Sequence, residues 1–298
     1  MSETPGLIYV GGYGRSGPTL LDLFCSNHQD VFGGGELTWL FRDALSGALC
    51  SCGEGVSECS FWRTVFTEVR RLEPAFDLKD AAHLTLKSER LFGKPSLRPR
   101  YQKLWRNVFR AIRAVSGKSF IVDSSKVSRL TFHRLGLLLD DLDNNIALLH
   151  LVRDPRGVMW SCKKGSNRRL ESGVAASQFG GIARGLCGWV FANWAVEDIC
   201  RRRAGVKKLL IRYEDFASDS TRELRRIADW ISLPASDKWR VVDNDTVLKP
   251  GHGIAGNRMR RQGEIRLQLD EQWRDRLPLY GRLLAMTVSR QMRSYGYE

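Results

Sequence analysis

The sequence predicts an α/β protein, a single domain in which a central parallel β-sheet is flanked by helices. Apolar runs of β-type residues alternate along the chain with stretches whose apolar residues recur at helical spacing. Four of the apolar runs end in polar or glycine-rich tips, as strands of a parallel sheet commonly do. We expect one domain over residues 1–298, because no repeat, low-complexity run or clear linker divides the chain.

The first apolar run breaks into glycines and restarts as a helix. Residues 7–10 are apolar, glycines occupy positions 11, 12, 14 and 17, and a helix is expected from Pro18 to about Asn27. Glycines let the backbone turn tightly and approach an anion, and the free amides at a helix start favour negative charge. The stretch therefore predicts a phosphate-binding loop, the alternative being a glycine-rich turn with no ligand.

This loop departs from the nucleoside-triphosphate template G-x-x-x-x-G-K-[ST]. Gly12, Gly17 and Thr19 fall in register with it. Pro18 stands in the lysine position, and the nearby cation is Arg15. Arginine offers a planar fork of donors suited to an oxyanion but does not reproduce the geometry of lysine. ATP or GTP hydrolysis is therefore the weaker interpretation.

A helix is expected to follow at residues 37–49, with Gly33 to Gly35 as a flexible approach and Glu36 at its start. A glutamate in this position commonly serves only as a favourable charge at the helix dipole. Next come Cys50, Cys52 and Cys59, in a polar stretch that we expect to be an exposed loop. Three cysteines without a nearby histidine are an incomplete zinc set, so a metal or a disulfide is the alternative there.

The middle of the chain predicts two strands with polar ends. Residues 60–100 indicate only weak helix and loop, whereas an amphipathic helix through residues 104–115 ends at Gly117. A strand then leads from Phe120 to Lys126, where an N-cap formed by one of the two serines is the alternative to a ligand-binding role. The continuous apolar run at 146–152 predicts a central strand, and Arg153 follows it directly.

The last third of the chain predicts a long helix over residues 178–203, a strand from Lys208 that ends near Tyr213, and a helix over residues 221–230. Residues 249–263 mix glycines with cations, which indicates a loop that folds over an anion. Helices are expected to close the chain over residues 270–298.

The formal net charge of +14 limits the classes of molecule that the protein is expected to bind. Most of the 47 basic residues are arginines, which bind phosphate and sulfate groups in bidentate fashion. The arginines are dispersed, and the sequence contains no zinc-finger, homeodomain or RNA-recognition signature. A multiply charged nucleotide explains this charge better than nucleic acid does.

The N-terminal residues and the cysteines indicate in which cellular compartment the protein is expected. The chain enters its first strand almost at once, without the regions of a signal peptide, and no run approaches the length of a membrane span. Its seven cysteines are an odd number, and four of them have apolar or helical surroundings. Both features favour a reducing compartment, and we expect the cytoplasm.

Two of these motifs resemble those of sulfotransferases that use 3′-phosphoadenosine 5′-phosphosulfate (PAPS). Residues 14–21 are similar to the family's 5′-phosphosulfate loop. Arg153 and Ser161, eight residues apart, match its 3′-phosphate motif in residue type and spacing. The resemblance is to the bacterial branch and to the tyrosylprotein and carbohydrate enzymes, more than to the cytosolic enzymes with a histidine base. It implies a P-loop sulfotransferase fold.

The resemblance also implies the reaction. A sulfuryl group would pass from PAPS to the hydroxyl of a small-molecule, lipid or carbohydrate acceptor, and adenosine 3′,5′-bisphosphate (PAP) would be released without a metal. A P-loop small-molecule kinase and a non-catalytic protein that binds nucleotides or nucleic acid are the alternatives. The sequence indicates neither the oligomeric state nor which acceptor is used.

Finally, the resemblance implies the site residues. Glu36 would be the catalytic base, since it matches a Gly-Glu pair about twenty residues beyond the loop arginine, and Arg15 and Lys126 would be catalytic cations. Residues 256–260 resemble the family's Gly-Asn-Pro-x-Arg segment, but Arg258 replaces the proline, which leaves Arg260 as the nucleotide contact. The expected donor-binding residues are Arg15, Ser16, Gly17, Pro18, Thr19, Leu20, Arg153, Ser161, Tyr213, Gly256, Asn257 and Arg260.

Overall fold

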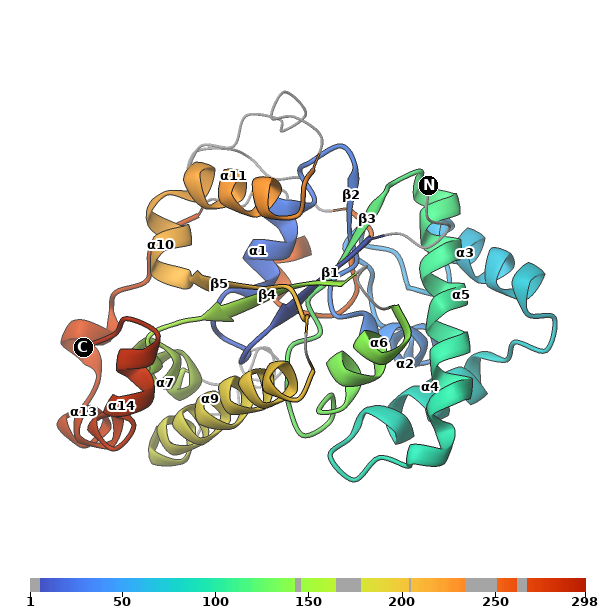
Figure 1. Ribbon diagram of the computed structural model, residues 1–298. Coiled ribbons are helices and arrows are strands. Elements are labelled where there is room, and N and C mark those ends of the chain that lie inside the picture. The colour runs from blue at the N-terminus through green and yellow to red at the C-terminus, as the bar shows by residue number, and fades with distance from the viewer. Residues whose placement is uncertain (1–5, 143–145, 165–177, 204, 234–250, 262–266) are drawn as a thin grey trace.

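The computed structural model describes residues 6–142, 146–164, 178–203, 205–233, 251–261 and 267–298. At its centre is a five-stranded parallel sheet with the order β2-β3-β1-β4-β5 (Figure 1). The strands are β1 (Gly6–Gly11), β2 (Val31–Gly33), β3 (Phe120–Asp123), β4 (Ile146–Val152) and β5 (Lys208–Arg212). In register, Leu7 of β1 lies between Ile121 of β3 and Ile146 of β4. The α/β prediction is confirmed.

The edge strand β2 was not expected from the sequence. It has three residues and runs directly into glycines, so it lacks the length of apolar pattern that indicates a strand. It pairs with β3 through Val31, Phe32 and Gly33. This pairing brings Gly34 and Gly35 to the end of β3, where the Gly34 amide donates to the Val122 carbonyl at 2.9 Å.

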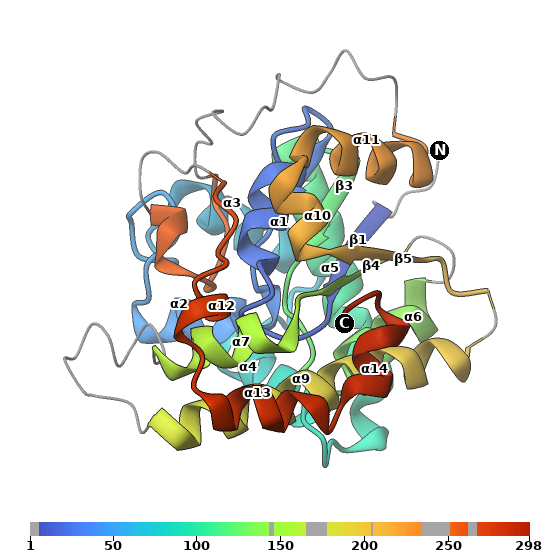
Figure 2. The same cartoon turned by 90° about the vertical axis from the view of Figure 1, so that its left-hand side faces the viewer.

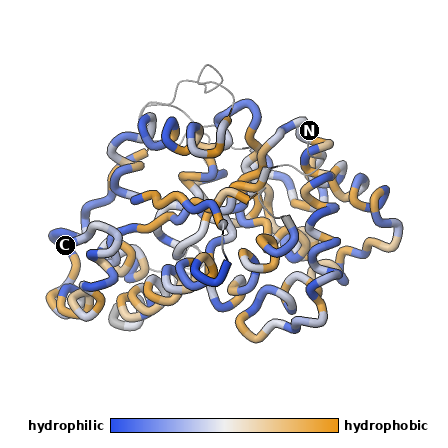
Figure 3. The backbone as a smooth tube through the Cα atoms, in the orientation of Figure 1, coloured by the Kyte–Doolittle hydropathy of each residue, from blue (hydrophilic) through white to orange (hydrophobic). Residues whose placement is uncertain are grey.

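Helices cover both faces of the sheet. One face carries α1 (Pro18–Cys25), α10 (Tyr213–Ser218) and α11 (Ser220–Trp230), which lie above the strands in Figure 1. Apolar residues of these helices, among them Phe24 and Phe216, pack against Val10 of β1. The opposite face carries α2 (Leu40–Ser46), α5 (Arg98–Ser116), α6 (Arg134–Leu142) and α9 (Gln178–Arg201). Figure 3 shows the apolar strands enclosed by these amphipathic helices.

Two regular helices, α3 (Ser60–Leu72) and α4 (Leu78–Glu89), replace the weak helix and loop expected over residues 60–100. In α3, Trp62, Val65, Phe66 and Val69 are buried at helical spacing. Asp77 caps α4, because its carboxylate accepts hydrogen bonds from the amides of Lys79 and Asp80. Both helices pack against α5, which ends at Gly117 as expected but begins at Arg98, six residues before the expected start.

A third group of helices packs at the β5 side of the molecule. There α12 (Trp273–Arg276) and α13 (Leu279–Met286) lie against α7 (Pro155–Lys163), and α14 (Ser289–Ser294) follows them in the chain (Figure 2). The short 3₁₀ turns are η1 (Leu37–Trp39), η2 (Pro95–Leu97) and η5 (Arg258–Arg261). Among the described residues, none of the helices has the length and apolar composition needed to cross a membrane.

Candidate functional site

The loop between β1 and α1 depends on two glycines. Any other residue at either position would displace neighbouring atoms. Gly12 has a φ of +111°, and a Cβ there would lie 2.2 Å from the carbonyl oxygen of Leu151. Gly17 has a φ of +91°, and a Cβ there would lie 2.8 Å from the Tyr213 ring. The loop is thereby packed closely against the ends of β4 and β5, and Pro18 begins α1 behind it.

A cleft of about 850 Å³ lies in front of this loop. Strand ends, the start of α1 and the C-terminal loop all contribute to its wall. Arg15, Glu36 and Arg153 all line it, so the two motifs that are far apart in the sequence share one cavity. The predicted site residues that line it are Arg15, Gly17, Pro18, Thr19, Leu20, Glu36, Lys126, Arg153, Ser161, Tyr213, Gly256 and Asn257.

Unusual backbone conformations gather at this cleft. Among the described residues, four residues other than glycine have a positive φ. Three of them, Arg15 (73°), Lys126 (63°) and Ala255 (46°), line the cleft. Left-handed backbone costs a residue with a side chain on the order of 1 kcal/mol or more, and such conformations tend to cluster at functional sites. The fold therefore holds both predicted catalytic cations in conformations that local preference disfavours.

Glu36 is positioned by two distant segments of the chain and by the nearby Trp39. Its backbone amide donates to the Ile254 carbonyl at 2.8 Å. The Lys126 ammonium lies 2.6 Å from Oε1, and the Trp39 indole N–H donates to Oε2 at 3.2 Å. The residue is 7% exposed, and it directly precedes η1, as the sequence predicts. A buried carboxylate thus faces the cleft beside a cation, in reach of a proton donor that enters there.

Arg153 connects the two sides of the cleft. Its guanidinium donates to the Arg15 carbonyl at 3.2 Å and to the Asp270 carbonyl at 2.9 Å, and the Asp270 carboxylate lies 3.3 Å away. The same group lies 4.3 Å from the centre of the Tyr213 ring. Arg153 Nε and Ser16 Oγ are buried and have no hydrogen-bond partner among the described residues. Ser161 enters the cleft from α7.

The C-terminal loop closes the cleft on the side of α1. Of the expected loop, the structure describes residues 251–261. The Asn257 amide donates to Thr19 Oγ1 at 3.2 Å, which joins this loop to the start of α1. Arg260 does not line the cleft. It is buried, and its guanidinium donates to the carbonyls of Gly253 (2.8 Å) and Ile254 (2.7 Å), so in this structure it supports the loop from behind.

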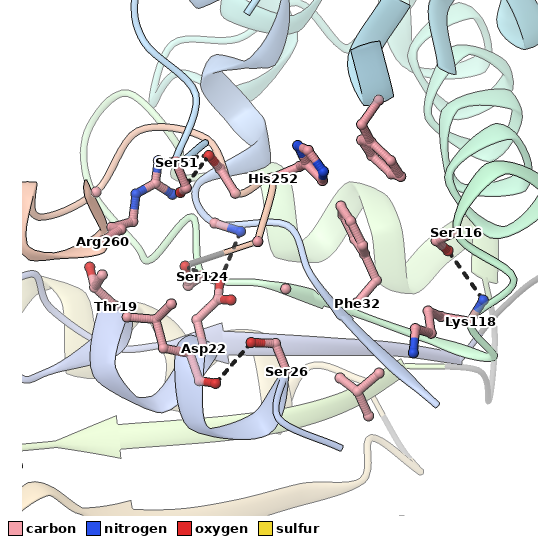
Figure 4. Close-up of a pocket in the computed structure, with 18 of the residues that line it drawn as sticks. Thr19, Asp22, Ser26, Phe32, Ser51, Ser116, Lys118, Ser124, His252 and Arg260 are labelled. Carbon is pink, nitrogen blue, oxygen red and sulfur yellow. Dashed lines mark hydrogen bonds between the residues drawn. The ribbon is translucent and has the colours of Figure 1, made fainter. Parts of the chain in front are cut away.

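A second cavity of about 370 Å³ lies behind the C-terminal loop of residues 251–261, and Figure 4 shows Arg260 and Asp22 in its wall. Asp22 belongs to α1 and accepts hydrogen bonds from the Gly35 amide (2.9 Å) and from Ser124 Oγ (2.8 Å). Burial raises the pKa of Asp22 to about 7, although these hydrogen bonds oppose the shift. Through these hydrogen bonds, the Asp22 carboxyl group links Gly35, which precedes Glu36, to Ser124 at the end of β3.

Sequence reasoning missed several residues of the cleft. Trp39 and Arg42 line it, and the Arg42 guanidinium lies 3.9 Å from the centre of the Trp39 ring. Their spacing, three and six residues after Glu36, puts them on the same helical face and is a signal that could have identified them. Asp270 carries no such signal, because only the tertiary structure brings it to Arg153.

A further pocket of about 330 Å³ adjoins the cleft and shares Arg15, Glu36, Trp39 and Lys126 with it. Its other walls include the Tyr13 side chain, hydroxyl groups of the turn after β3, and Arg184 of α9. Glu36 and Lys126 therefore stand between two cavities. A molecule in either cavity would meet the same carboxylate and ammonium.

The cysteine-containing segment differs from the expected exposed loop. Cys50 and Cys59 are buried, while Cys52 is exposed. The expectation that no histidine lies nearby is also wrong, since His252 Nδ1 lies 3.3 Å from Cys59 Sγ. A separation of 193 residues between them hid this proximity from the sequence.

The chain thus combines a glycine-rich loop after β1, a parallel sheet and one cleft that is lined by both Arg15 and Arg153. Residues 5–237 match the model of the Sulfotransferase family, and the chain belongs to that family. The mouse (Mus musculus) protein named Carbohydrate sulfotransferase 5 is 26% identical in an alignment of 159 residues that covers 47% of this chain and 38% of that protein. The chain thus aligns with well under half of that relative's length.

Two solved structures resemble the fold over nearly the whole chain. The sulfotransferase domain of the Synechococcus PCC 7002 olefin synthase has a TM-score of 0.52 and 18% identity, covering 97% of this chain and 96% of that domain. The sulfotransferase domain from the curacin biosynthetic pathway has the same TM-score and identity, covering 100% and 99%. At these identities the similarity concerns the fold.

Proposed function

We propose that this protein transfers a sulfuryl group from PAPS to an acceptor hydroxyl. The observation that carries the proposal is the single cleft in which the Arg15 loop meets Arg153 and Ser161. Its volume of about 850 Å³ is in the range of nucleotide-sized sites. The buried, unpartnered Arg153 Nε and the amides at the start of α1 fit an anionic donor.

We assign a role to each residue on the basis of its position in the cleft. The phosphosulfate would lie against the loop, with Arg15, the amides of Gly17 and Thr19, and Lys126 around its oxygens. The 3′-phosphate would lie at Arg153 and Ser161, while Tyr213 packs nearby. Gly256 and Asn257 cover the loop from the C-terminal side. Arg260, which supports this segment, would act on the donor indirectly.

Glu36 would act as the general base. It would accept the proton of the acceptor hydroxyl while the hydroxyl oxygen attacks sulfur in line, and the S–O bond to the 5′-phosphate would break with its electron pair on the phosphate. Lys126, now paired with Glu36 at 2.6 Å, would turn to the developing charge on the leaving oxygen and release the carboxylate for proton transfer.

The acceptor would occupy the pocket of about 330 Å³ on the other side of Glu36. Aromatic groups of Tyr13 and Trp39 and several hydroxyl groups line this pocket, which suits a polar ring system. Sequence similarity to a protein named as a carbohydrate sulfotransferase makes carbohydrates the first acceptor class to examine. Small molecules and lipids that carry hydroxyl groups are the other acceptor classes to test.

The assay that tests this function supplies PAPS with a panel of carbohydrate, phenol and lipid acceptors and measures PAP release together with sulfated product. We expect both products in equal amounts with at least one acceptor. A parallel reaction contains ATP and Mg²⁺ instead. Phosphorylated product in that reaction, with no transfer from PAPS, would favour a kinase and contradict the proposal.

A further inference from the structure

Four potential metal ligands converge behind the loop that leads to Glu36. Cys50 and Cys52 lie between α2 and α3, Cys59 directly precedes α3, and His252 belongs to the C-terminal loop. The three sulfur atoms and an imidazole nitrogen all lie within 4.8 Å of one another. His252 Nδ1 is 3.3 Å from Cys59 Sγ and 4.0 Å from Cys50 Sγ, and the sulfurs of Cys52 and Cys59 are 3.6 Å apart.

The three individual separations, 3.3, 3.6 and 4.0 Å, are close to those of a tetrahedral zinc site. Zinc bonds of about 2.3 Å to sulfur and about 2.0 Å to nitrogen put the ligand atoms roughly 3.5–3.8 Å apart in a tetrahedron. Three thiolates and one imidazole are a set of ligands typical of structural zinc. We propose that Cys50, Cys52, Cys59 and His252 bind one zinc ion, and that this ion has a structural role because the four ligands leave no open coordination position.

The surrounding residues hold the ligands in place. The Phe61 ring stacks on the His252 imidazole, with centroids 4.9 Å apart and planes 8° apart. The Trp62 indole N–H donates to the His252 carbonyl at 2.7 Å. A tight turn carries the first two cysteines, since the Gly53 amide donates to the Cys50 carbonyl at 3.0 Å and Gly53 has a φ of +97°. Such neighbours fix the orientation of a ligand and raise the affinity for metal.

A disulfide between Cys52 and Cys59 is the competing use of these sulfurs. It would join the two positions that are already 3.6 Å apart. It would also leave Cys50 and His252 unused, although both are directed at the same point. The convergence of all four ligand atoms favours the zinc ion.

The zinc ion would fasten the C-terminal loop to the body of the protein. Next to His252, the Gly253 carbonyl accepts hydrogen bonds from the Ser51 amide (3.2 Å) and the Ser51 hydroxyl (3.0 Å), and Figure 4 shows Ser51 beside His252. Ile254 then forms a parallel bridge with Gly35, directly before Glu36. Zinc therefore stabilises the segment that positions Glu36, a consequence that rests on the proposed function.

Metal analysis of the 298-residue protein tests the site without any assay of transfer. The protein is produced with zinc in the medium, desalted, and measured by mass spectrometry for metals. We expect about one zinc ion per chain in wild type and in the control Cys187→Ser, whose cysteine is exposed on α9. Cys52→Ser and His252→Ala should retain little zinc. Cys52 is exposed, so its variant keeps the test valid should His252→Ala fail to fold.

Two further measurements, the affinity for zinc and the absorption spectrum of the cobalt-loaded protein, give the decisive outcomes. Because changes around a metal ligand already weaken binding about 10- to 100-fold, loss of the Cys52 thiolate should weaken zinc binding by at least about 100-fold in competition with a chromophoric chelator. Cobalt added to the metal-free protein should give the absorption of a tetrahedral thiolate site. Only trace zinc in wild type with no such spectrum, equal zinc in Cys52→Ser, or a Cys52–Cys59 disulfide in protein kept from oxidants would overturn the proposal.

Discussion

Glu36 illustrates how much one residue depends on its neighbours. On its own, a glutamate before a helix is a favourable charge and nothing more. In the structure it is buried between Lys126 and Trp39, and its backbone is fixed by Ile254. The sequence places it correctly at the start of η1. It could not show the ion pair with Lys126, which spans 90 positions and depends on how β3 packs against the glycines before Glu36.

Replacement of this carboxylate tests its proposed role. Glu36→Gln keeps the size of the side chain but cannot accept a proton, so turnover with PAPS should fall by a factor on the order of 10²–10⁴. PAP affinity, measured by calorimetry, should stay close to that of wild type. The control Glu68→Gln changes a surface residue of α3 that pairs with Arg71 and should leave turnover unchanged. Near-normal turnover in Glu36→Gln would contradict this role.

Asp22 predicts a pH dependence of stability. The unfolded chain releases this proton near pH 4, whereas the folded protein retains it up to about pH 7. Between these values the unfolded state binds fewer protons, so the Asp22 contribution makes the protein less stable as the pH rises through this window. Asp22→Asn lacks this titrating group. The free energy of unfolding of the variant minus that of wild type should therefore rise by about 2–3 kcal/mol between pH 5 and pH 8.

Urea denaturation at the two pH values measures this difference. The control Asp229→Asn alters an exposed carboxylate of α11 and should follow the wild-type pH profile. If the free-energy difference between Asp22→Asn and wild type is the same at pH 5 and pH 8, the raised pKa of Asp22 is incorrect.

At the scale of elements, the predictable parts are those with a strong local pattern. The span of β4 and the end of α5 at Gly117 follow from apolar runs and a terminating glycine. The β2 strand has only three residues, and pairing with β3 forms it. The helices α3 and α4 pack on α5, and the glycine- and cysteine-rich stretch before them obscured their pattern.

A buried ionic network joins α4, α6 and β3 behind the site. Arg134 pairs with Glu89 and with Asp123, the latter at 2.7 Å, and all three side chains are fully buried. The Ser125 amide donates to Asp123 at 3.0 Å, and Ser125 Oγ accepts from the Thr38 amide at 3.1 Å. The network thereby supports both the Lys126 turn and the η1 turn after Glu36.

Removal of the shared cation should destabilise the whole domain. Arg134→Leu leaves the buried carboxylates of Glu89 and Asp123 without their shared cation, and we expect a loss of about 3–5 kcal/mol in the free energy of unfolding. Arg98→Ala removes a half-exposed pair with Asp140 and should cost about 1 kcal/mol or less. Chemical denaturation compares the two variants. Similar losses in both would mean that the buried network contributes no more than a surface pair.

At the scale of the whole molecule, the sheet topology brings the site together. The central positions of β1 and β4 put the Arg15 loop beside Arg153, as sequence reasoning required. The C-terminal elements were the least predictable part. Arg260 supports a loop instead of lining the cleft, Asp270 reaches Arg153, and His252 joins three cysteines, all through contacts between distant segments. The cytoplasmic location stays a prediction.

The central claim is that this cleft binds a nucleotide with both a 5′- and a 3′-phosphate. Calorimetric titration with PAP and with ATP, with and without Mg²⁺, measures it most directly, using wild type, Arg153→Ala and the control Arg156→Ala, whose guanidinium pairs with Asp154 outside the cleft. We expect wild type and Arg156→Ala to bind PAP at least about tenfold more tightly than ATP, a difference of about 1.4 kcal/mol, and Arg153→Ala to lose most of that preference. Tighter binding of ATP than of PAP by wild type, or a preference for PAP that survives in Arg153→Ala, would contradict the account.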